Sequence, residues 1–108
     1  MNDLVYYLSG PISGNPKYLA DFRDAEEKLR RNGIKNIINP ANLGSVLHEE
    51  AGYEDYMDLC MQLLDKAHAI VQLPGWEQSL GCQREYGYSL ALEKATYPLS
   101  LMLEVRKK

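Results

Sequence analysis

The segment LVYYLSGPISG, residues 4–14, decides the fold of this chain, because it joins a buried strand to a tight loop. An apolar, β-prone run extends from Leu4 to Leu8. The run ends in a serine, two glycines and a proline, and these residue types terminate strands and form turns. The segment therefore predicts a buried strand followed by a loop of small residues.

A helix is expected directly after this loop. Asn15 suits the N-cap position and Pro16 the first helical position, where proline is favoured. In open α/β sheets, a strand, a small-residue loop and a helix N-terminus together bind anionic or sugar-phosphate groups. The chain has neither the GxGxxG pattern of dinucleotide-binding folds nor the Gly-Lys-Ser/Thr of a P-loop.

A second loop of the same kind occurs in LPGWEQSLGCQRE, residues 73–85. Its Pro-Gly pair stops the preceding apolar run, and Ser79 is a natural N-cap. Trp76 either caps the core or offers a flat face for stacking on a ligand or for a subunit contact. Glu85 then falls in the second turn of the predicted helix. Because exposed helix N–H groups create a positive field, we expect this carboxylate to stay ionised, as a nucleophile or an ion-pair partner.

Strand-like and helix-like patterns alternate along the chain without a linker or repeat. We therefore predict a single-domain three-layer α/β/α sandwich spanning residues 1–108, with a flavodoxin-like or Rossmann-like parallel sheet of four to five strands. Ligands of such sheets bind beyond the carboxyl ends of the strands, so both loops belong to one crevice. After the first strand, the expected elements are a helix around 19–29, a strand at 34–39, an irregular or weakly helical segment at 41–52, a helix around 56–67, a strand at 69–73, a helix at 79–94 and a strand at 99–103.

Composition and charge exclude several classes of protein. Hydrophobic residues make up 45% of the 108 residues, and the net charge of −3 disfavours binding to a nucleic-acid backbone. No apolar run approaches the ~20 residues of a membrane span, and no signal peptide is recognised. The two cysteines lack CxxC spacing, and His48 and His68 are isolated, so neither a disulfide framework nor a metal site is expected. We expect a cytoplasmic protein that binds a small molecule.

Four segments resemble the nucleoside 2-deoxyribosyltransferase-like superfamily, in particular its small, often phage-encoded members of unassigned activity. The resemblance covers nearly the whole chain. Its segments are YYLSGPISG at 6–14, INPA at 38–41, YMDLCMQLLDKAHAI at 56–70 and LPGWEQSLGCQREYGYSLAL at 73–92.

The resemblance implies cleavage of the N-glycosidic bond of a (deoxy)nucleoside or its 5′-monophosphate, without a metal or organic cofactor. Glu85 matches the nucleophile, Tyr7 a tyrosine that orients it, and Ser79 a residue that holds the sugar or its phosphate. A carboxylate suits this chemistry, because an oxocarbenium-like transition state needs nearby negative charge. The full set of expected substrate-binding residues is Ser9, Gly10, Pro11, Ile12, Gly14, Pro40, Gly75, Trp76, Ser79 and Gly81.

One position departs from the family pattern. The family uses an aspartate to handle the leaving base, and its position falls at Cys60 here. Asp58 cannot replace it, because two residues span about 200° around a helix. A thiol is a weak proton donor at neutral pH, and Cys60 lies on an apolar stripe typical of a buried, inert cysteine. Either the base is handled differently, or the protein is a catalytically degenerate nucleotide-binding protein or an interaction module with a vestigial pocket.

The tyrosine content suggests contacts with a partner. Eight tyrosines stand against one phenylalanine, and four of them flank the two helices nearest the expected crevice: Tyr53, Tyr56, Tyr86 and Tyr88. Small α/β domains commonly pair such helices across a two-fold axis, and relatives in the superfamily are homo-oligomers. We expect at least a dimer.

Overall fold

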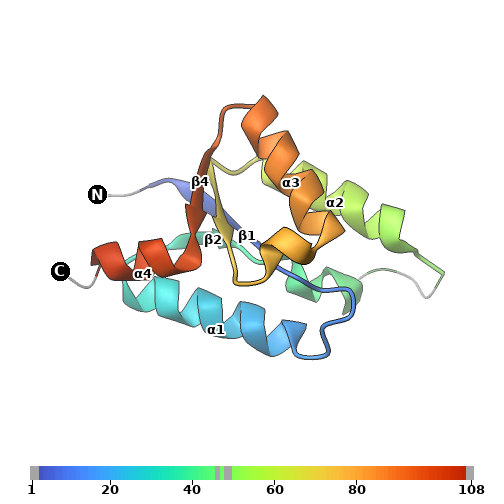
Figure 1. Ribbon diagram of the computed structural model, residues 1–108, viewed down its shortest axis with the longest axis horizontal. Coiled ribbons are helices and arrows are strands. Elements are labelled where there is room, and N and C mark those ends of the chain that lie inside the picture. The colour runs from blue at the N-terminus through green and yellow to red at the C-terminus, as the bar shows by residue number, and fades with distance from the viewer. Residues whose placement is uncertain (1–2, 46, 48–49, 107–108) are drawn as a thin grey trace.

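The computed structural model describes residues 3–45, 47 and 50–106. Its centre is a four-stranded sheet with the strand order β2-β1-β3-β4, and every neighbouring pair is parallel (Figure 1). The predicted parallel α/β sheet is thus confirmed. The strands are β1 (Val5–Ser9), β2 (Asn36–Ile38), β3 (Ala69–Gln72) and β4 (Ala95–Pro98).

Helices cover both faces of this sheet and give the predicted three layers. α1 and α4 lie on one face, and α2 and α3 lie on the other (Figure 1). The helices are α1 (Tyr18–Arg31), α2 (Tyr53–Asp65), α3 (Leu80–Ala91) and α4 (Leu99–Arg106), with short 3-10 turns η1 (Pro40–Ser45) and η2 (Trp76–Gln78). In the described part of the chain, no helix has the length and apolarity that a membrane crossing requires.

Alternation along β1 divides its side chains between two hydrophobic cores. Tyr6 and Leu8 face α1 and pack with its Phe22. Tyr7 faces the opposite side and packs with Cys60 of α2. Because successive residues of a strand point to opposite faces, this single strand anchors both layers.

The strand order places a topological switch point between β1 and β3. The chain leaves β1 toward β2 on one side and then returns across β1 to β3 on the other, so the two crossovers diverge at this point. Such a topological switch point opens a crevice beyond the carboxyl ends of the strands. The loops after Ser9 and Gln72 border it, as predicted from the sequence.

The prediction that Asn15 caps a helix starting at Pro16 is wrong. α1 begins at Tyr18. The Asn15 side chain instead accepts a hydrogen bond from the backbone N–H of Lys17 and donates one to the carbonyl of Pro11, both at 3.1 Å. It closes a turn in the loop, which is the alternative that asparagine side chains offer the backbone.

The predicted last strand at 99–103 is also wrong. The strand lies earlier, at β4, and residues 99–106 form α4. Leu99, Met102 and Leu103 pack on the α1 side of the sheet, at the i, i+3 and i+4 spacing of one helix face. A short apolar run fits a strand and a helix equally well, and the packing against α1 selects the helix.

Candidate active site

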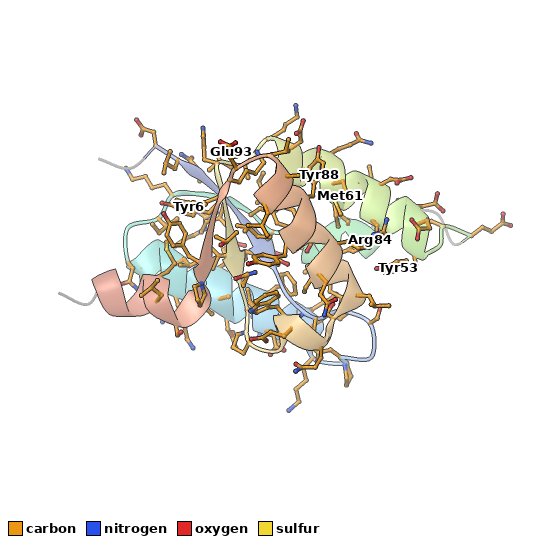
Figure 2. All side chains as sticks on the ribbon, turned by 45° about the horizontal axis from the view of Figure 1, so that its top comes forward. Tyr6, Tyr53, Met61, Arg84, Tyr88 and Glu93 are labelled. Carbon is orange, nitrogen blue, oxygen red and sulfur yellow. The ribbon has the colours of Figure 1, made fainter. Side chains whose placement is uncertain are left out.

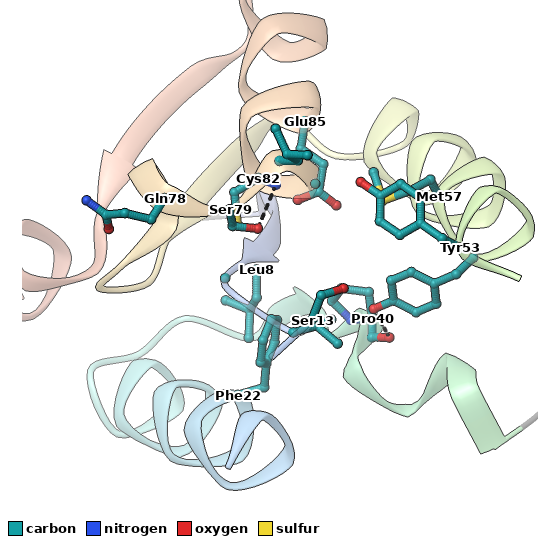
Figure 3. Close-up of a pocket in the computed structure, with 15 residues that line it drawn as sticks. Leu8, Ser13, Phe22, Pro40, Tyr53, Met57, Gln78, Ser79, Cys82 and Glu85 are labelled. Carbon is teal, nitrogen blue, oxygen red and sulfur yellow. Dashed lines mark hydrogen bonds between the residues drawn. The ribbon is translucent and has the colours of Figure 1, made fainter. Parts of the chain in front are cut away.

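A pocket of about 430 Å³ opens at the carboxyl end of β1, and α2 and α3 form two of its walls (Figure 3). The loop after β1, the start of α1 and the first residue of η1 form the remaining side. Its lining is largely apolar, with one carboxylate. The lining residues are Leu8, Gly10, Ile12, Ser13, Phe22, Pro40, Tyr53, Tyr56, Met57, Gln78, Ser79, Leu80, Gly81, Cys82 and Glu85.

Glu85 is the carboxylate of this pocket. α3 starts after its N-cap Ser79, whose Oγ accepts a hydrogen bond from the N–H of Cys82 at 3.3 Å, so the predicted cap is confirmed. The helical repeat then turns Glu85 inward. The Tyr7 hydroxyl donates to its Oε2, and the Ser9 hydroxyl donates to its Oε1 at 2.6 Å.

Burial governs the charge of Glu85. Only 6% of the residue is exposed. Burial raises the pKa of its carboxyl from 4.5 to about 7, although the hydrogen bonds from Ser9 and Tyr7 act to lower it. The expectation that this group stays fully ionised at neutral pH is therefore not met, because burial raises its pKa. A pKa near neutrality suits a group that exchanges protons or acts as a nucleophile.

Tyr7 and Cys60 lie behind Glu85 in the core. Both are fully buried. Desolvation, together with the neighbouring Glu85 carboxylate, raises the pKa of the Tyr7 phenol. Burial raises the pKa of the Cys60 thiol to about 11, although the nearby hydroxyls of Tyr7 and Tyr56 lower it. Tyr7 is thus both a core residue and a hydrogen-bond donor to the site, whereas Cys60 is a buried thiol of the core.

Half of the residues predicted for the site line the pocket. They are Gly10, Ile12, Pro40, Ser79, Gly81 and Glu85. Tyr7 and Ser9 reach it through their hydrogen bonds to Glu85. Pro11, Gly14, Gly75 and Trp76 are not among the lining residues.

Two of these four residues have structural contacts of their own. Trp76 packs on the ring of Tyr86, with ring centroids 5.1 Å apart. Gly75 has a φ of +88° beside Pro11, a backbone conformation that favours glycine. These contacts shape the loop after β3, so this loop contributes fewer residues to the pocket than the sequence predicted.

The wall from α2 was missed as part of the site. Tyr53, Tyr56 and Met57 occupy one face of α2 at i, i+3 and i+4 spacing, and all three line the pocket. From the sequence, the two tyrosines are expected on a partner surface rather than in the site. Arg84 of α3 contacts this wall at the surface. It pairs with Glu54 at 3.1 and 3.2 Å and lies 5.6 Å from the centre of the Tyr53 ring (Figure 2).

The remaining lining residues that were not predicted come from four other segments, and they include Leu8 of β1 and Leu80 at the start of α3. Ser13 lies in the loop after β1, and Phe22 lies on α1. Gln78 and Cys82 flank the N-cap of α3. Helical spacing from Ser79 and Glu85 was the available signal for Cys82. Among the described residues, no group of three or more His, Cys, Asp and Glu side chains is placed to hold a metal ion.

Fold and site together define a class of protein: a small parallel α/β domain with a buried carboxylate at its topological switch point. The chain belongs to the family described as "Domain of unknown function (DUF4406)", whose model matches residues 4–97. A comparison with curated proteins gave no significant match.

Proposed function

We propose that this protein cleaves the N-glycosidic bond of a (deoxy)nucleoside or its 5′-monophosphate, with Glu85 as the nucleophile. The observation that carries the proposal is the Glu85 carboxylate in the pocket, held by the hydroxyls of Tyr7 and Ser9. The resemblance of the four sequence segments to the nucleoside 2-deoxyribosyltransferase-like superfamily supports the same assignment.

The reaction would take two steps. An oxygen of ionised Glu85 forms a bond to C1′ of the sugar while the C1′–N bond breaks, and the base leaves with the electron pair and takes up a proton. Water or a second base then attacks C1′ and releases the Glu85 carboxylate. Tyr7 and Ser9 fix the carboxylate in one orientation, which reduces the entropy lost on reaching the transition state.

The lining suits the two halves of such a substrate. Tyr53, Tyr56 and Met57 provide an apolar wall for a flat base. On the opposite side, Ser79 and the first turn of α3 offer a hydroxyl and backbone N–H groups for the sugar or a phosphate. In Figure 3 the Glu85 carboxylate lies between these two regions.

Turnover by the wild-type protein tests the proposal. The protein is incubated with deoxynucleosides, ribonucleosides and their monophosphates, and free base is measured by chromatography. Release of base from at least one substrate is expected, and its absence from all of them would exclude the proposed activity. Release that persists in Glu85→Ala would assign the nucleophile to another group.

Tyr7→Phe is expected to shift the pH dependence of this activity. The substitution removes a donor that lowers the pKa of Glu85. A hydrogen bond to a charged group contributes about 1.5–3 kcal/mol, so the rising limb of kcat/KM should move up by roughly one to two pH units. Activity should be lost near pH 7 and partly return near pH 9. Tyr6→Phe, on the opposite face of β1, is the matched control, and an equal loss at every pH would contradict the role given to Tyr7.

A nucleotide-binding protein that retains the pocket without turnover is the second candidate. Cys60 favours it, because the position of the family's aspartate is held here by a buried thiol outside the pocket lining. Calorimetry with nucleosides, nucleotides and ADP-ribose would separate the two functions, since tight binding without release of base supports only the second. A homo-oligomeric state and a cytoplasmic location stay predictions.

A further inference from the structure

We propose that the preferred substrates are nucleosides whose base carries a fixed positive charge, such as N-ribosyl pyridiniums and N7-alkylated purine nucleosides. This inference rests on the glycosidic cleavage proposed for Glu85. It adds the chemical class of the leaving base.

The first observation is the set of groups that face the pocket. Glu85 carries the one carboxyl group among the fifteen described lining residues, and none of them is Asp, Lys, Arg or His. The other polar side chains are four hydroxyls, from Ser13, Tyr53, Tyr56 and Ser79, the amide of Gln78 and the thiol of Cys82. Amides and hydroxyls can hydrogen-bond a base, but they are far weaker acids than a carboxylic acid. Since Glu85 must be ionised to attack C1′, the described lining offers no second carboxyl to protonate the base.

The thiols and the phenol in and around the pocket do not replace the family's aspartate as a proton donor. Cys60 is fully buried outside the lining, and burial raises its pKa to about 11. The Tyr56 hydroxyl already donates its proton to the carbonyl of Pro40 at 3.0 Å, and burial raises the pKa of this phenol. Burial also raises the pKa of the Cys82 thiol. All three groups hold their protons at neutral pH.

A base with a fixed positive charge needs no proton to leave. The Glu85 carboxylate forms a bond to C1′, the C1′–N bond breaks, and its electron pair neutralises the ring nitrogen. Water then adds to C1′, the bond to Glu85 breaks with its electron pair returning to the carboxylate, and the proton of water passes to solvent. One cationic substrate and one water thus yield a neutral base, a free sugar and one proton.

The pocket also suits the charge itself. The rings of Phe22, Tyr53 and Tyr56 line it, and aromatic faces attract flat cations. A positive charge near Glu85 favours its ionised form, and so opposes the burial that raises its pKa to about 7. A cationic base would therefore favour the ionised form of Glu85, the group that attacks the sugar of the same substrate.

A matched pair of substrates tests this inference on the wild-type protein. 7-Methylguanosine and guanosine share the sugar and the ring system and differ in the charge of the base. General acid catalysis typically contributes 10²–10⁴-fold, so kcat/KM for 7-methylguanosine, corrected for the uncatalysed reaction, should exceed that for guanosine by at least ~100-fold. Nicotinamide riboside should be cleaved as well, with one proton released per nicotinamide in a pH-stat.

Two variants and three possible outcomes test the preference for cationic bases. Glu85→Gln should abolish cleavage of both cationic substrates, and Glu77→Gln, which changes an exposed glutamate outside the lining, should leave it intact. Equal rates for guanosine and 7-methylguanosine would overturn the preference for cationic bases and leave glycosidic cleavage standing. Cleavage of neutral nucleosides alone would do the same. No cleavage of any nucleoside, charged or neutral, would overturn the proposed function with it.

Discussion

Replacing Glu85 by Gln is expected to abolish base release while making the folded protein more stable above neutral pH. Gln keeps the size of the side chain but has no nucleophilic carboxylate, so kcat should fall by at least ~10³-fold. The same change removes a charge that the folded protein must hold out of water. Activity and stability are therefore expected to change in opposite directions at one position.

The pH dependence of this stability gain follows from the pKa of Glu85. Burial raises that pKa from 4.5 in its ordinary state to about 7 in the folded protein. The folded state thus holds the proton of Glu85 more tightly than the unfolded state does. The resulting stabilisation of the folded state, here called the advantage, is fully present below pH ~4.5. The advantage is lost as pH rises through about 7, and amounts to about 3 kcal/mol. Above pH 7, Glu85→Gln should be more stable than wild type by up to this amount.

Urea denaturation of both proteins between pH 4 and 9 measures the effect. The wild-type free energy of unfolding should fall relative to that of Glu85→Gln across this range, and the two curves should be closest at the acid end. Glu77→Gln controls for the loss of one surface charge, because Glu77 is exposed in η2. Parallel curves for wild type and Glu85→Gln would show that Glu85 is not a buried, neutral acid at low pH.

Cys60→Asp is expected to destabilise the protein by several kcal/mol without raising base release. The substitution restores the residue type of the superfamily, but position 60 is fully buried beside Leu64, Ala67 and Ile70. An unpaired carboxylate in such a cluster pays the cost of dehydration. It would also lie close to Tyr7, which hydrogen-bonds Glu85, so the added negative charge would raise the pKa of the nucleophile further.

Thermal melting and base release, measured on the same preparation, check this prediction. Cys60→Ser is the matched control, since it keeps a small side chain with one donor and should lose much less stability. Cys60→Asp with normal stability and faster release from neutral nucleosides would contradict the prediction. That result would place residue 60 at the leaving base and count against the preference for cationic substrates.

Local sequence signals predicted the parallel sheet and its ligand edge. A strand alternates its side chains between two faces, so the run from Leu4 to Leu8 already required two buried layers. The Ser79 cap and the helical repeat then fixed the direction in which Glu85 points. The resemblance added Tyr7 as its partner, and the hydrogen bond between them is present in the structure.

Two local predictions failed where several structures satisfy the same residues. Asn15 can cap a helix or close a turn, and the contact with the carbonyl of Pro11 selects the turn. The apolar run after Pro98 can form a strand or a helix, and packing against the α1 side selects the helix. The turn at Asn15 is closed by contacts within four residues, with Pro11 and Lys17. The helix after Pro98 depends instead on packing against α1, which is distant in the sequence.

The sequence by itself determined the elements that carry Ser79 and Glu85, since caps, turns and hydrophobic periods act over short stretches of chain. Only the tertiary structure decided their state. Burial gives Glu85 a pKa near 7, removes Cys60 from the pocket, and makes one face of α2 a wall of the site. These properties depend on dehydration and on contacts between distant segments, and neither exists until the chain has folded.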